Sequence, residues 1–242
     1  MFDGPHIETA LTAWVNYLAS VDPRVSTSVA IARIPDFPFI PEHVRGRTVL
    51  NIRFAYPGDA KTGEQLAAPL RAAAPVYVDD LGELPVASID RIHNDPPNPT
   101  VGWVRGRMLA RVDQQLVDTI LGFAGTGKQF PFVAIEVRHL GPASATDVPE
   151  GSAVSGRSAH ATLSLVGAPN AALFEKIVPE AAAALLGAVT PWINAENNVN
   201  FAGVFDSRAD YEAVWPRAIF DRLGEVRLKY DPKAMFVYGV PA

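Results

Sequence analysis

The sequence contains no cysteine, which excludes disulfides, thiolate metal sites and a cysteinyl bond to a cofactor, and which is compatible with a reducing compartment. It also has no basic stripe: Lys and Arg number 21 against 26 Asp and Glu, and the net charge is −5. We therefore expect no nucleic-acid partner. The first residues combine no cationic start with a long apolar run, so we expect neither a signal peptide nor a membrane span, and a cytoplasmic protein.

Several common catalytic patterns are missing too. The five histidines show no H-x-H or H-x-x-x-H spacing, and no serine lies in a G-x-S-x-G motif, so neither a metal site nor a hydrolase triad is predicted. Residues 122–128 have the G-x-x-x-x-G-K spacing of a phosphate-binding loop. However, Gln129 replaces the Ser or Thr that would hold Mg²⁺, and the predicted order is helix, loop, strand. We interpret this segment as a glycine-rich helix end.

The chain has 242 residues, of which 48% are hydrophobic, enough for a substantial core. Alternation of apolar and polar residues predicts strands at 25–33, 48–56, 132–138 and 159–166. Helical spacing predicts helices at 7–18, 62–74, 108–123, 170–189 and 216–230. Thr62 followed by Gln65 predicts a capping box for the second helix, which Pro69 should kink. The proline-rich stretch 81–99 is predicted to be irregular.

These elements favour an α+β fold, a mostly antiparallel sheet with helices packed on one face. The helices at 170–189 and 216–230 are expected to help cover the apolar face. The predicted core residues of the sheet are Ile52, Phe54, Val133, Ile135, Leu163 and Leu165. The opposite, polar face is predicted to carry Asn51, Arg53, Glu136, Arg138, His160 and Thr162. This face suits a ligand or a partner, although Glu136 and Arg138 could equally form a solvated ion pair.

Four segments resemble the berberine-bridge-like FAD-linked oxidases. The end of the chain, WPRAIFDRLGEVRLKYDPKAMF at 215–236, resembles the family's closing helix and Tyr-Asp-Pro turn. Residues 136–167 resemble its Glu-x-Arg-x-Leu-Gly-Gly-Ala strand and the strand that follows, with Pro142 in place of the second glycine. Residues 52–71 resemble its strand, Gly-Asp turn and helix, and RIHNDPPNP at 91–99 resembles a loop. Their order and spacing extend the resemblance over nearly the whole chain.

The resemblance implies that the chain is the substrate-binding and C-terminal part of such an oxidase. Residues 1–190 would form the substrate-binding domain over the isoalloxazine ring, and 191–242 a segment packing back on it or toward the flavin domain. Nothing in the sequence resembles the N-terminal flavin-binding half, so this chain alone is not expected to hold FAD. With an FAD-binding domain or subunit as partner, the protein would oxidise an alcohol or an activated C–H bond of a small molecule, with hydride transfer to flavin and reoxidation by oxygen.

The resemblance also assigns residues. Asn200 matches the asparagine that contacts the flavin, and Asn198 stands where many members have a proton-removing tyrosine. An amide is no general base near neutral pH, so the catalytic residue is unassigned, and Asn198→Tyr would restore a proton acceptor. The expected substrate-binding residues are Arg53, Glu136, Arg138 and His160. Three alternatives stay open: Asn200 as a turn residue before Gly203, a flavin-free small-molecule-binding or dimerisation module, and an inactive fragment.

Overall fold

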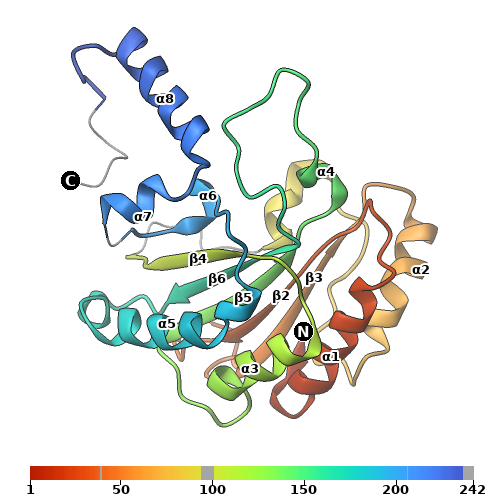
Figure 1. Cartoon of the computed structure of the whole chain (residues 1–242). Helices are drawn as coiled ribbons and strands as arrows, with labels where there is room; N and C mark the ends of the chain where they lie inside the picture. The colour runs from red at the N-terminus through yellow and green to blue at the C-terminus, as the bar shows by residue number, and fades with distance from the viewer. Residues whose placement is uncertain (39, 94–100, 206, 237–242) are drawn as a thin grey trace.

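The computed structural model describes residues 1–38, 40–93, 101–205 and 207–236 (Figure 1). Its centre is a six-stranded sheet with the order β1-β3-β2-β5-β6-β4, in which every neighbouring pair is antiparallel. The strands are β1 (Phe2–Asp3), β2 (Ser26–Arg33), β3 (Thr48–Ala55), β4 (Val104–Leu109), β5 (Phe132–His139) and β6 (Ala161–Gly167). The predicted α+β class with an antiparallel sheet is confirmed.

Helices pack on one face of this sheet. The α-helices are α1 (Ile7–Leu18), α2 (Ala60–Arg71), α3 (Gln114–Ala124), α4 (Pro142–Ala145), α5 (Ile177–Ala188), α6 (Val199–Ala202), α7 (Arg208–Glu212) and α8 (Arg217–Tyr230), and a 3-10 helix, η2, spans Val86–Ile92. Buried residues of α1, α2, α3 and α5 form one core with the apolar face of the sheet. Figure 1 shows α6, α7 and α8 on the other side of the sheet.

The strand register decides which residues share a face, because directly paired residues of antiparallel strands point to the same side. Ile135 pairs with Ile31 on β2 and with Leu165 on β6, and all three are buried against the helices. One residue further along, Glu136 pairs with Ala30 and Ser164 on the opposite, open face. The two predicted faces are therefore real for these strands.

Two strand predictions need correction. Strands β1 and β4 were not predicted, and the segment 108–123 is not one helix: its first residues end β4, and α3 begins only after Asp113, whose carboxylate accepts a hydrogen bond from the Leu116 N–H at 2.9 Å. Val133 is not a core residue, because a register shift between Phe132 and Ala134 gives its place in the core to Phe132.

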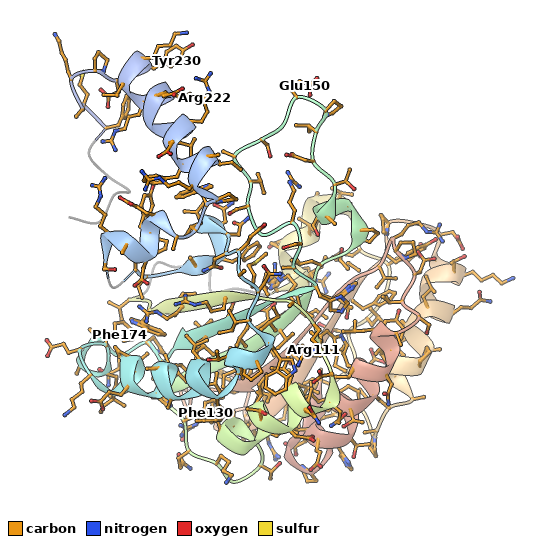
Figure 2. The ribbon with its side chains drawn as sticks, in the orientation of Figure 1. Arg111, Phe130, Glu150, Phe174, Arg222 and Tyr230 are labelled. Carbon is orange, nitrogen blue, oxygen red and sulfur yellow. The ribbon has the colours of Figure 1, made fainter. Side chains whose placement is uncertain are left out.

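Two further helix predictions also change. The N-cap of α2 is Asp59, which accepts from the Thr62 N–H at 2.9 Å, so the helix begins before the predicted capping box, and Pro69 lies inside it. The predicted cover of the apolar face by residues 216–230 is wrong: α5 covers it, whereas α8 has no buried residue. Figure 2 shows Arg222 and Tyr230 on α8, which stands away from the sheet.

The glycine-rich segment after α3 ends a helix, as predicted. The Gly125 N–H donates to the Leu121 carbonyl at 2.8 Å, and Gly127 has a φ of 77°. Most of the loop-like motif at 91–99 lies outside the described residues. Within the part of the chain that the structure describes, no helix has the length and apolar character needed to cross a membrane.

Candidate functional site

A charged cluster lies on the open face of the sheet, where one carboxylate meets two guanidinium groups. The Arg138 Nη2 and Nε atoms donate to Glu136 Oε1 at 2.9 and 3.1 Å, and Arg53 Nη1 lies 3.4 Å from Glu136 Oε2. The Glu136 and Arg53 side chains are 13% and 17% exposed, whereas that of Arg138 is 37% exposed. Arg138 is thus the member of the cluster most open to a ligand.

Small side chains surround this cluster. In the register, Ala30 and Ser164 flank Glu136, while Ser28 and Thr162 flank Arg138. Ser28 and Thr162 are 3% and 1% exposed, so they form a closed floor. Because these paired neighbours have small side chains, the longer side chains of Glu136 and Arg138 extend beyond them on this face. As predicted, Arg53, Glu136 and Arg138 therefore lie together on one face of the sheet.

Helix α6 borders the same face at the β4 edge. Gly106 on β4 pairs with Ser164, which in turn pairs with Glu136. A side chain at Gly106 would collide with the Phe201 carbonyl oxygen, so the α6 backbone lies directly on this strand. Since neighbouring strands are ~4.8 Å apart, α6 begins roughly 10 Å from Glu136 along this row. Asn200, on α6, is exposed.

Asn198 holds this border in place. Its side-chain oxygen accepts from the Asn200 N–H at 2.9 Å, and its amide donates to the Ser155 carbonyl at 3.0 Å. Next to it, the Gly156 N–H donates to the Glu196 carboxylate at 2.9 Å. Asn198 is only 8% exposed. It is therefore a buried N-cap that ties α6 to the loop before β6, and a tyrosine in its place would make neither of these two hydrogen bonds.

His160 has a different neighbour from the one expected. Its ring lies 5.0 Å from that of His139 in an edge-on contact, and no hydrogen bond or ion pair joins it to the charged cluster in the described residues. Burial lowers the pKa of His139, with a smaller contribution from the nearby His160, and burial also lowers the pKa of His160. A substrate-binding role for His160 stays a prediction.

A pocket that the sequence did not indicate lies beside β4. It has a volume of about 210 Å³ and is bounded by β4, residues 193–197 and the segment around α7. Arg107 lines it and donates to the Gly106 carbonyl at 3.0 Å, and Arg105 also lines it while only 7% exposed. The sequence did not indicate the pocket because it did not indicate β4, which forms one of its walls.

Comparison with known proteins rests on structure alone. No family model and no curated protein matches the sequence. Among solved structures, 6-hydroxy-D-nicotine oxidase from Arthrobacter nicotinovorans is 14% identical with a TM-score of 0.69, and the match covers 96% of this chain and 50% of that one. A berberine-bridge-like protein from Physcomitrella patens, in its D396N variant, is 12% identical with a TM-score of 0.70, covering 100% and 52%.

Berberine bridge enzyme from Eschscholzia californica is 9% identical with a TM-score of 0.69, and the match covers 99% of this chain and 52% of the enzyme. The chain has the fold of half a berberine-bridge-like oxidase. It spans about half the length of the solved structures that it matches. The resemblance that the sequence motifs indicate is thereby confirmed at the level of the fold.

The resemblance implies FAD, and two features of this chain bear on which part of that cofactor it could contact. The exposed Asn200 and the open sheet face can meet a flat ring system. The sequence contains no G-x-G-x-x-G loop, the pattern that holds a pyrophosphate at a helix N-terminus. The sequence therefore lacks that type of phosphate-binding loop.

Proposed function

We propose that this chain is the substrate-binding half of an FAD-dependent oxidoreductase that oxidises an alcohol or an activated C–H bond. One observation carries the proposal: the open sheet face bears the cluster of Arg53, Glu136 and Arg138, in a fold that makes up about half of several FAD-dependent oxidases. A second polypeptide or domain supplies the flavin-binding half and covers this face.

Glu136, Arg138 and Asn200 have different roles in this proposal. Of the three charged side chains in the cluster, only the Glu136 carboxylate has lone pairs that can accept a proton. Arg138 holds that carboxylate through two hydrogen bonds and orients the substrate. Asn200 would hydrogen-bond the flavin ring. The FAD held by the partner would supply the hydride acceptor and the route for electrons to oxygen.

Helix α8 supports the need for a flavin-binding half. It carries an apolar stripe of Ile219, Leu223 and Val226, yet it has no buried residue. Beyond the stripe, Leu228 and Tyr230 are 72% and 74% exposed. Because an amphipathic helix gains most of its stability from packing its apolar side, we propose that α8 packs on the flavin-binding half.

The test is to produce this chain together with the polypeptide encoded immediately upstream and to measure anaerobic bleaching of bound flavin by a panel of alcohols. We expect bleaching by at least one alcohol and a roughly 10²–10⁴-fold slower rate for Glu136→Gln, the usual contribution of general-base assistance. Glu64→Gln, at an exposed position of α2 on the helix-covered side of the sheet, is the matched control outside the cluster. Equal rates for the wild type and Glu136→Gln would remove Glu136 from the proposed chemistry, and the absence of any flavin-binding partner would favour a flavin-free binding module.

A further inference from the structure

Donors and positive charge exceed acceptors in the cluster on the open face. Each guanidinium has about five N–H donors, whereas one carboxylate offers about four acceptor positions. Arg53 and Arg138 therefore carry more donors than Glu136 can satisfy. The Arg53 Nη1 atom shows this directly: it is buried and makes no hydrogen bond to any described residue, although it lies 3.4 Å from Glu136.

The surroundings leave this excess uncompensated inside the chain. The flanking residues Ala30, Ser28, Ser164 and Thr162 bring no negative charge, so the cluster keeps a net charge of +1 from two arginines and one glutamate. A partly buried charge and a buried donor without an acceptor are both costly. A ligand that brings a negatively charged acceptor would balance this charge and accept hydrogen bonds from Arg138, the most exposed member of the cluster.

We infer that the substrate is a hydroxy acid whose carboxylate binds to Arg138 and Arg53 and whose hydroxyl group faces Glu136. This inference deepens the proposed function and rests on it. In the oxidation, hydride leaves the carbon that bears the hydroxyl for FAD, the hydroxyl proton passes to Glu136, and an oxo acid is released. A planar carboxylate suits Arg because its two oxygens accept parallel N–H bonds.

The experiment measures binding to this chain alone, so it does not depend on flavin. Isothermal titration at low ionic strength compares mandelate, a hydroxy acid, with mandelamide, its neutral counterpart of nearly equal shape. We expect mandelate to bind at least about tenfold more tightly, in keeping with hydrogen bonds to charged groups. Arg138→Gln should abolish this preference, while Arg222→Gln on α8 should keep it, and circular dichroism should show that both variants are folded.

Three results would overturn the inference: no detectable binding of mandelate, equal affinity for mandelate and mandelamide, or an unchanged preference in Arg138→Gln. A titration with lumiflavin tests whether Arg138 instead binds a carbonyl group of the flavin ring. Arg138-dependent binding of lumiflavin without binding of mandelate would also overturn it. Since the proposed function is tested by flavin bleaching in the assembled protein, mandelate can fail here while another alcohol still bleaches the flavin.

Discussion

Replacing Ile135 by alanine tests the assignment of the two sheet faces. Ile135 is 2% exposed on β5 and pairs with Ile31 and Leu165 in the core. The change removes three carbons, each contributing ~0.8 kcal/mol of transfer free energy when buried. The cavity left behind adds to that loss, so the free energy of unfolding should fall by roughly 2–5 kcal/mol.

Arg138→Ala is the matched change on the same strand but on the open face. Its side chain is 37% exposed, and Glu136 keeps its contact with Arg53 when the Arg138 guanidinium is removed. A partly exposed ion pair contributes about 0–1 kcal/mol, so Arg138→Ala should unfold nearly like the wild type. Equilibrium urea denaturation followed by circular dichroism measures both. Equal destabilisation by the two variants would show that the faces are assigned wrongly.

Three further changes probe the border of the site. Gly106→Ala should lower the free energy of unfolding by roughly 1–3 kcal/mol and speed amide exchange in α6, because the added carbon collides with the Phe201 carbonyl. Gly102→Ala, which has open space around it, is the control and should do neither. Asn198→Tyr should cost at least ~1 kcal/mol in urea denaturation through the lost cap, and a variant as stable as the wild type would contradict the capping role. Burial lowers the pKa of His139 and His160 from 6.5, so protonation of either ring favours the unfolded chain. The free energy of unfolding should therefore fall as the pH drops below 6.5 toward their folded-state pKa values. A urea midpoint equal at pH 7.5 and 5.5 would refute this.

The strands that sequence reasoning found are those with one clearly apolar face. Residues such as Ile31, Ile135 and Leu165 alternate with small or polar neighbours, and that period survives folding. Strand β4 was not predicted because Arg105 and Arg107 occupy positions that pair with buried leucines of β6. With two arginines at these positions, the segment lacks the apolar alternation that indicates a strand. The bulge at Val133 escaped because an extra residue changes the face without changing the composition.

The sequence placed Arg53, Glu136 and Arg138 on one face of the sheet, but it fixed the spacing of side chains only within one strand. Glu136 and Arg138 are two residues apart, which places them on one face of any strand. The contact between Arg53 and Glu136 depends on β2 lying between β3 and β5. The alternation of residues within each strand does not predict this strand order. The role of Asn198 could have been found, because asparagine before a short helical segment is a strong N-cap signal. Its long-range bond to Ser155 could not.

The central claim is that this chain forms the substrate half and that another polypeptide or domain holds the flavin. The most direct measurement is the flavin absorbance that remains after gel filtration, first for this chain mixed with FAD and then for this chain produced with the polypeptide encoded immediately upstream. The account predicts a colourless chain in the first case and about one FAD for each copy of the chain in the second. Flavin retained by this chain alone, or a colourless protein in both cases, would contradict it.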